Sequence, residues 1–236
     1  CLMTIHYHGT PITPHATGIN TLAGKFFCVS HARPDQVVIA HKIGQGVMLD
    51  NGAFSAWKRG HVVDWDAYYL WTEKWMSAFP TTWAVIPDEV GGGTQLQISL
   101  IKSWPHGHRG APVWHLDEPI DHLLHLADNW PRICFGSTAE YANVGSLDWM
   151  RRVDEAFTAL THRHKFLPWV HMLRGLQCCD ISKGFYFPFS SLDSTDVAQN
   201  FKVRGPARAM ADKWDAQQCP GGPYVPQPVQ LLLEAV

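Results

Sequence analysis

Eight short apolar runs alternate with longer, more polar stretches along the chain, and this alternation restricts the fold more than any other feature. The runs are expected strands at residues 4–9, 26–30, 46–52, 83–89, 111–117, 132–137, 167–173 and 184–191. Each run is bounded by Gly, Pro or polar residues, which is typical of strands that are buried on both faces. Eight strands with helices between them predict a single α/β domain, a (β/α)8 TIM barrel whose helices lie outside.

The stretches between the runs carry helix signals. The expected helices cover residues 13–24, 33–44, 63–79, 119–130 and 146–164. Ser146 is a candidate N-cap, and basic residues gather near the end of the helix that it would start. We expect the barrel to occupy residues 1–205, and residues 206–236 to add a C-terminal helix and a Pro/Gly-rich tail packed on the barrel.

The composition is that of a folded chain without a strong charge. Of the 236 residues, 46% are hydrophobic and 17% are charged, so the chain can build a core and is not a disordered protein. The formal net charge of −2 lacks the basic signature of a generic nucleic-acid coat, although a local basic face can still bind phosphates. The six cysteines form no CxxC pair, and no apolar run reaches about 18 residues. We therefore expect a reducing, cytoplasmic setting and no membrane partner.

Polar residues and glycines gather where the expected strands end. In a (β/α)8 barrel the active site forms at the carboxyl ends of the strands. The residues at those ends are Asp50, Asn51, Asp88, Glu89, His115, Asp117, Gly136, Ser137, His171, Arg174 and Asp193. Any single one has an ordinary alternative role as a helix N-cap or a turn residue. Six strands that end in this way, among them those that end in Asp50, Asp88 and Asp193, favour a site.

Three aspartates at one mouth suggest glycosyl or proton-transfer chemistry. One acid can attack an anomeric carbon, and another can move a proton. A third can hold an amidine-like base edge, because a carboxylate accepts two parallel N–H bonds.

Five motifs follow one another between about residue 45 and residue 200: "VMLDNGAFSAW" (47–57), "VIPDEV" (85–90), "ICFGSTAEY" (133–141), "VHMLRG" (170–175) and "SLDSTDVAQN" (191–200). Taken together and in this order, they resemble motifs of the tRNA-guanine transglycosylase superfamily. The residues of these motifs are more similar to those of the DpdA-type 7-deazaguanine DNA transglycosylases of phages and mobile elements. One departure concerns the zinc site of the tRNA enzymes. Only Cys219 follows Asp193, and the adjacent Cys178 and Cys179 lack zinc-ligand spacing, so we expect no metal and no zinc-binding subdomain.

The resemblance implies a role for each candidate residue. Asp193 would be the nucleophile that attacks C1′ of a guanosine nucleotide, and Asp50 the general acid–base. Their ordinary alternatives are the N-cap of the last barrel helix for Asp193 and an Asx turn before Gly52 for Asp50. The residues expected to bind the substrate are Asp88, Phe54, Glu89, His115, Gly136, Ser137, His171 and Arg174.

The implied activity is a base exchange in which guanine in DNA is replaced by a 7-deazaguanine derivative, such as 7-cyano-7-deazaguanine. The reaction would pass through a covalent glycosyl-aspartate and need no cofactor. The expected partners are DNA and the two bases, with a homodimer or an accessory protein left open. Three alternatives remain: the same exchange on tRNA, a non-catalytic nucleic-acid- or base-binding barrel, and a glycoside hydrolase that uses two carboxylates in the same way.

Overall fold

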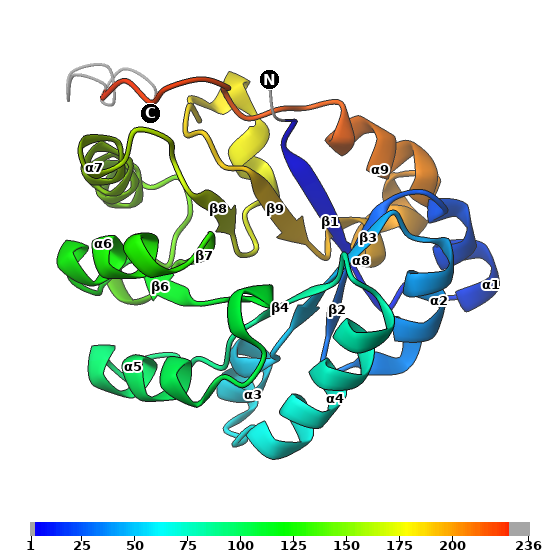
Figure 1. The fold of residues 1–236 in the computed structure, drawn as a ribbon. Coiled ribbons are helices and arrows are strands. Elements are labelled where there is room, and N and C mark those ends of the chain that lie inside the picture. The colour runs from blue at the N-terminus through cyan, green and yellow to red at the C-terminus, as the bar shows by residue number, and fades with distance from the viewer. Residues whose placement is uncertain (1–2, 227–236) are drawn as a thin grey trace.

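Parallel strands form the centre of the molecule, and helices surround them (Figure 1). The computed structural model describes residues 3–226. The strands are β1 Ile5–Gly9, β2 Phe26–Ser30, β3 Gly46–Asp50, β4 Trp83–Val85, β5 Gly110–Ala111, β6 Val113–His115, β7 Arg132–Gly136, β8 Trp169–Met172 and β9 Ser191–Ser194. Every pair of neighbouring strands is parallel, as the alternation with helices requires.

The sheet closes on itself at Pro112. Its strand order is β5-β4-β3-β2-β1-β9-β8-β7-β6, so the two end strands are consecutive in the chain and only Pro112 separates them. The Ile86 N–H donates to the Ala111 carbonyl at 2.9 Å, and the Cys134 N–H donates to the Pro112 carbonyl at 2.8 Å. Because proline has no N–H, β5 and β6 are one strand interrupted at this residue. The predicted (β/α)8 barrel is confirmed.

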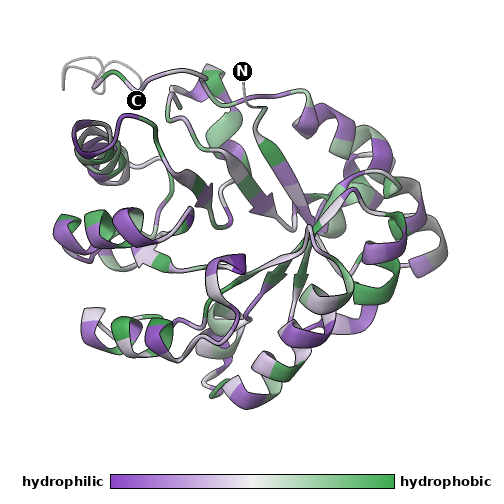
Figure 2. Cartoon of the chain, in the orientation of Figure 1, coloured by the Kyte–Doolittle hydropathy of each residue, from purple (hydrophilic) through white to green (hydrophobic). Residues whose placement is uncertain are grey.

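The helices follow the strands in alternation. They are α1 His15–Gly18, α2 Val37–Ile43, α3 Ala53–Arg59, α4 Trp65–Ala78, α5 Thr94–Ser103, α6 Ile120–Asn129, α7 Leu147–Arg163, α8 Asp196–Arg204 and α9 Ala207–Asp215. Ser146 caps α7 as expected, since its side chain accepts a hydrogen bond from the Trp149 N–H. Figure 2 shows hydrophobic and hydrophilic residues alternating along the surrounding helices. Within residues 3–226 no helix combines the length and apolar character that a membrane crossing needs.

Two helices, α3 and α5, have no counterpart among the expected helices, and α8 is the last barrel helix, for which no bounds are predicted. Both α3 and α5 follow a glycine with a positive φ, Gly52 at 79° and Gly93 at 75°, and neither has a side-chain cap. The usual start signal, a Ser, Thr, Asp or Asn at the N-cap position, is therefore missing, although Asn51, one residue before Gly52, accepts a hydrogen bond from the Ala53 N–H at 2.9 Å.

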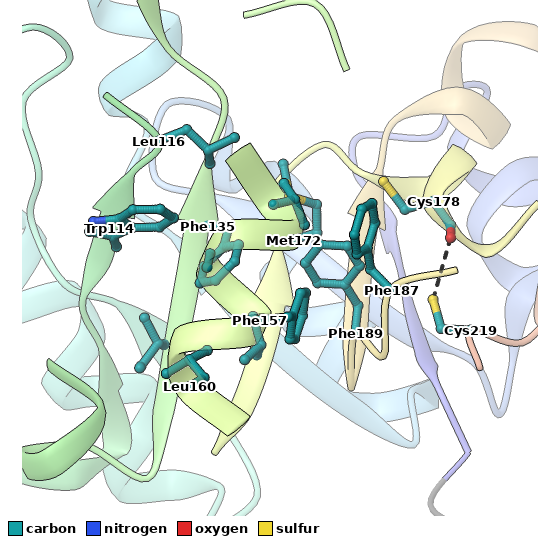
Figure 3. Close-up of a cluster of buried hydrophobic side chains, with 14 of the residues drawn as sticks. Trp114, Leu116, Phe135, Phe157, Leu160, Met172, Cys178, Phe187, Phe189 and Cys219 are labelled. Carbon is teal, nitrogen blue, oxygen red and sulfur yellow. Dashed lines mark hydrogen bonds between the residues drawn. The ribbon is translucent and has the colours of Figure 1, made fainter. Parts of the chain in front are cut away.

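The bounds expected for the eighth strand are wrong. The strand expected at 184–191 is β9, which begins only at Ser191. The aromatic residues of the preceding segment, Phe185, Phe187 and Phe189, instead enter a buried cluster with Phe157 of α7 (Figure 3). The run is apolar because it fills the space between the barrel and α7, and Pro188 has no N–H to donate to a neighbouring strand. Asp193 consequently lies within the strand and not beyond it.

Side chains inside the barrel form layers. A buried cluster fills the middle with Tyr7, Cys28, Met48, Trp83, Val85, Ala111, Val113 and Cys134. Because side chains alternate along a strand, the next inward positions toward the carboxyl ends are Gly9, Ser30, Asp50, His115, Gly136 and Asp193. An apolar middle layer thus supports the polar layer at the carboxyl ends, and Arg132 lies over Trp83 toward the opposite end.

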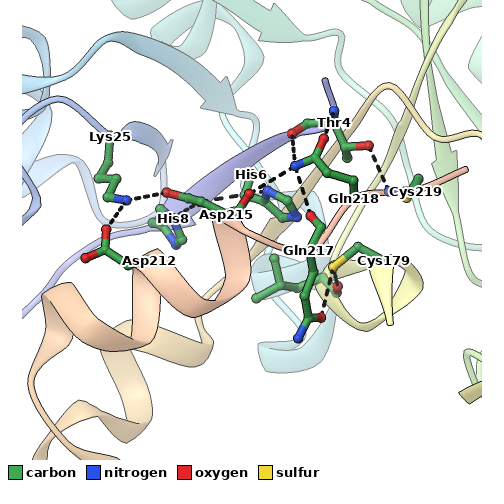
Figure 4. Close-up of polar contacts among 11 residues, drawn as sticks. Thr4, His6, His8, Lys25, Cys179, Asp212, Asp215, Gln217, Gln218 and Cys219 are labelled. Atoms are coloured by element: carbon green, nitrogen blue, oxygen red, sulfur yellow. Dashed lines mark hydrogen bonds and ion pairs between the residues drawn. The ribbon is translucent and has the colours of Figure 1, made fainter. Parts of the chain in front are cut away.

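The C-terminal segment is tied to the first strand (Figure 4). Asp215 of α9 accepts hydrogen bonds from His8 at 2.9 Å and from Lys25 at 2.5 Å. The Gln218 side chain accepts a hydrogen bond from the Thr4 N–H at 2.7 Å, and the Cys219 N–H donates to the Thr4 hydroxyl at 3.1 Å. These contacts hold the segment after α8 against β1.

We predict that Phe187→Ala lowers the free energy of unfolding by about 3–5 kcal/mol, because it opens a cavity beside Phe157 and Phe189. Urea unfolding measures the loss. The control is Phe166→Ala, which removes a side chain that is 79% exposed. It should change the free energy by no more than about 0.5 kcal/mol. Equal midpoints for the two variants would show that the aromatic cluster does not stabilise the barrel.

Candidate functional site

The polar layer opens into a cavity of about 460 Å³ at the carboxyl ends of the strands. This volume lies in the range of small-molecule sites. Seven of the ten predicted site residues line it: Asp50, Phe54, Asp88, His115, Gly136, Arg174 and Asp193. The structure therefore brings together side chains that are up to 143 residues apart, from Asp50 to Asp193.

Three predicted site residues do not line this cavity. The Glu89 side chain is exposed beside a neighbouring hollow, and its backbone is held by Gln97. Ser137 is buried, and its hydroxyl accepts a hydrogen bond from the Trp149 indole at 2.9 Å. His171 is fully buried one layer below the cavity, opposite Ser191 in the strand register.

Asp193 is held by donors from β8 and the turn after it. The Arg174 N–H donates to Asp193 Oδ1 at 2.7 Å, and His171 Nε2 lies 3.2 Å from the same oxygen. Arg174 has a φ of 54°, a left-handed conformation that is costly for a residue with a side chain and is often found at functional sites. The N-cap alternative for Asp193 is wrong, because α8 starts at Asp196 with Thr195 at its N-cap position.

A chain of buried hydrogen bonds fixes the proton positions on His171. The Trp169 indole N–H donates to the Ser191 hydroxyl at 2.7 Å, and that hydroxyl lies 2.8 Å from His171 Nδ1. Since an indole can only donate, the Ser191 proton is free to bond Nδ1, which leaves the His171 proton on Nε2, facing Asp193. Burial lowers the pKa of His171 and Asp193 opposes this shift, so the ring is neutral. His171 is thus a donor to Asp193 and not a wall of the cavity.

Asp50 lies in surroundings that favour its protonated form. Burial raises the pKa of Asp50 to about 6, and the charges of Asp193 and Asp88 add to the shift. Hydrogen bonds from Ser30 and from the Gly52 N–H oppose it, the latter at 3.1 Å. The Asx turn considered for Asp50 is therefore present as well. A carboxyl group that titrates near neutrality is suited to general acid–base work.

Asp88 is fixed by one partner on each oxygen. Its Oδ1 accepts a hydrogen bond from the Asn51 amide at 2.7 Å, and its Oδ2 lies 3.0 Å from His115 Nε2. Burial alone would lower the pKa of His115, but hydrogen bonds to Asp88 and Glu118 raise it to about 10, so the ring is cationic. Both ring nitrogens face carboxylates, and the expected bond from His115 to a base carbonyl stays a prediction. Each Asp88 oxygen keeps a second lone pair for a ligand.

Phe54 and Arg174 lie together on the cavity wall. The Arg174 guanidinium is 3.6 Å from the centre of the Phe54 ring, a cation–π contact that covers one face of the ring. Lys58 Nζ lies 5.3 Å from the same ring. Burial lowers the pKa of Arg174, and three nearby carboxylates oppose this shift. A base that stacks on Phe54 must use the other face of the ring or displace Arg174.

Gly136 provides space beside His115. A Cβ atom at this position would lie 3.0 Å from His115 Cδ2 and 3.2 Å from Val113 Cγ1, closer than side chains normally approach. A glycine therefore lets His115 reach Asp88 while leaving the cavity open above β7.

Sequence analysis missed several contributors to this site. Ser30 ends an expected strand, so the same strand-end rule would have found it. Asn51 was noted as a strand end but its bond to Asp88 was not foreseen. Trp169 gave no signal, because it acts through Ser191 on the neighbouring strand, whose hydroxyl contacts His171.

Comparison with known proteins adds little to this geometry. No protein-family model matches the chain, and no curated protein sequence matches it. Solved structures that match include tryptophan synthase from M. tuberculosis in its open form with BRD0059 bound, and in its aminoacrylate- and BRD0059-bound form. Each is 9% identical, covers 93% of this chain and 94% of its own, and has a TM-score of 0.48. Similarity this low gives no argument about activity.

We predict that His115 stabilises the protein less as the pH rises. Its folded pKa of about 10 exceeds the ordinary value of 6.5, so its contribution is complete below pH 6.5 and is lost as the pH rises through 10. His115→Asn should cost about 2 kcal/mol or more near pH 6, because two buried carboxylates lose a cationic partner. The deficit should shrink near pH 10.

Urea unfolding of both proteins at the two pH values measures the difference. The control is His125→Asn, a change on α6 that leaves Asp88 and Glu118 with their donor. A deficit that is the same at both pH values would mean that His115 is neutral in the folded protein.

Proposed function

We propose that this protein is a base-exchange transglycosylase that replaces guanine in DNA with a 7-deazaguanine derivative through a covalent glycosyl-aspartate. One observation carries the proposal: two carboxyl groups in unlike surroundings share one cavity. Asp50 has a pKa raised to about 6, while Asp193 accepts bonds from Arg174 and faces His171. Pairs of acids whose surroundings differ in this way commonly divide into a nucleophile and an acid–base.

In the first half of the reaction, Asp193 attacks C1′ of the target nucleotide. The C1′–N9 bond breaks and its electron pair stays with guanine. Protonated Asp50 gives its proton to the departing base. The result is a sugar esterified to Asp193, with free guanine in the cavity.

In the second half, the incoming base replaces the ester. Asp50, now a carboxylate, takes the N9 proton of the 7-deazaguanine, and N9 attacks C1′. The bond from C1′ to Asp193 breaks and the carboxylate is restored. Two inversions at C1′ leave the sugar in its original configuration.

Asp88 is suited to select the base. Guanine and its 7-deaza derivatives share one edge, with an N1–H and an exocyclic amine side by side. The remaining lone pairs of Asp88 can accept both donors, since Asn51 and His115 hold the carboxylate in place. A single recognition group would therefore accept both the leaving and the entering base.

The depth of the site implies that the target base leaves its helix. Asp88 and Asp193 are 7% and 8% exposed, and they lie at the ends of barrel strands below the rim of the cavity. A base stacked within a duplex cannot reach them, so the nucleotide must be flipped out or single-stranded.

The first test is incorporation of labelled guanine into duplex DNA, single-stranded DNA and tRNA by wild type, Asp193→Asn and Asp50→Asn. We expect label in DNA only, none above background with Asp193→Asn, and a loss of about 10²–10⁴-fold with Asp50→Asn. Glu73→Gln is the control, because this exposed acid lies on α4, outside the cavity and the hollows beside it.

The other outcomes are equally informative. Label in tRNA alone would move the reaction to tRNA, and label in no substrate would favour a barrel that binds without exchange. Exchange that survives Asp193→Asn would exclude Asp193 as the nucleophile.

We also predict opposite pH dependences for the two half-reactions. Release of guanine needs protonated Asp50, so its single-turnover rate should fall as the pH rises through about 6. Capture of the incoming base needs the Asp50 carboxylate, so that rate should fall as the pH drops through the same value. Rapid-quench measurements of each step provide the test. Two profiles with the same slope would assign the proton transfer to another group.

A further inference from the structure

Exposed cations lie at the rim of the cavity, outside the buried cations His115 and Arg174 that accompany the carboxylates. The carboxylates of Asp50, Asp88 and Asp193 lie at the strand ends, whereas the rim carries the exposed side chains of Arg33, Lys58 and Arg59. Arg33 pairs with Asp35 at 3.2 Å. Lys58 and Arg59 lie in the last turn of α3, and no carboxylate among residues 3–226 is within ion-pair distance of either. Lys58 instead contacts the Phe54 ring.

An exposed aromatic residue lies beside these cations. Trp57 of α3 is 56% exposed, and its ring centre is 5.7 Å from that of Phe54, which lines the cavity. Two aromatic rings therefore lead from the cavity wall to the outer surface of α3.

Two shallower hollows extend the cavity around α3. One, of about 240 Å³, shares Asn51, Ser55 and Arg59 with the cavity. The other, of about 180 Å³, is lined by Trp57 and by His61 and Val62 of the following loop. Two acids border these hollows: Asp64 lines the first together with Arg59 and is engaged as the N-cap of α4, and Glu89 lines the second. A continuous surface thus runs from the catalytic cavity past Arg59 to Trp57.

Exposed cations and a single exposed aromatic residue are common on protein surfaces. The chain has such a pair elsewhere: Lys165 Nζ lies 5.5 Å from the ring of Phe166, just before β8 at the opposite end of the barrel. The cations and Trp57 on α3 differ from this pair because they adjoin the cavity. The same cavity is lined by the carboxylates of Asp50, Asp88 and Asp193. A ligand that fits this polarity has N–H donors at its inner end and negative charge at its outer end, as a nucleotide does.

We propose that α3 and the loop at residues 60–64 bind the DNA strand next to the extracted nucleotide. Arg33, Lys58 and Arg59 contact its phosphates, and Trp57 stacks on a neighbouring base. The inference rests on the proposed function, since the same strand delivers its nucleotide to Asp193. It explains how a chain with a net charge of −2 holds a polyanion through one local patch.

The test is binding of a fluorescent single-stranded oligodeoxynucleotide, followed by anisotropy over a range of salt concentrations. The double variant Lys58→Ala/Arg59→Ala should bind more weakly and lower the slope of log K against log salt by about 1.4, since each phosphate contact on a single strand contributes about 0.7. Trp57→Ala should weaken binding about fivefold or more at every salt concentration and leave the slope unchanged.

The matched control is Lys165→Ala/Phe166→Ala, which removes an exposed cation and an exposed aromatic ring from the other end of the barrel. It should change neither the affinity nor the slope. Urea midpoints of all variants confirm that the barrel remains folded. Affinities of the α3 variants equal to those of the control, or no binding by wild type, would overturn the inference.

The outcome separates this inference from the proposed reaction. Weakened binding by the α3 variants together with no label incorporation by wild type would keep the strand-binding surface and reject the exchange. Incorporation by wild type together with unchanged binding by the α3 variants would keep the exchange and reject the strand-binding surface.

Discussion

Closure of the barrel is the constraint on which the rest of the structure depends. In a closed ring of parallel strands, the last inward side chain of every strand points to one small region. Below that region the interior is filled, and Trp83 donates a hydrogen bond to the Tyr7 hydroxyl at 2.9 Å across it. Charged groups at the carboxyl ends therefore meet water on one side only, and each needs support from the protein.

The protein supports its three aspartates to different degrees. Asp88 has an amide and a cationic imidazole, and Asp193 has a backbone N–H and a neutral imidazole. Asp50 has no cation as a hydrogen-bonding partner within residues 3–226, and repulsion from its two neighbours adds to the effect of its burial. The same arrangement that destabilises the Asp50 carboxylate at neutral pH makes this group available for proton transfer.

The parts of the fold that the sequence reveals are those with local signals. Apolar runs bounded by Gly and Pro gave the strands, and strand ends gave Asp50, Asp88 and Asp193. The helices α3 and α5 are not predicted, because a glycine occupies the N-cap position of each in place of a capping side chain. Ser137 and His171 were assigned to the substrate because their buried partners, Trp149 and Ser191, are distant in sequence. The alternation of side chains along a strand predicts which face a residue lies on, but it does not predict which distant residues contact it.

The bonds that hold Asp193 have a consequence for the second half of the proposed reaction. Trp169 can only donate, so the chain through Ser191 and His171 runs in one direction and ends on Asp193. Once the carboxylate is esterified, its oxygen still faces the Arg174 N–H and the His171 Nε2–H. As the incoming base displaces the ester, negative charge returns to an atom whose donors never left. In the proposed reaction, the groups that hold Asp193 would thus also make it a good leaving group.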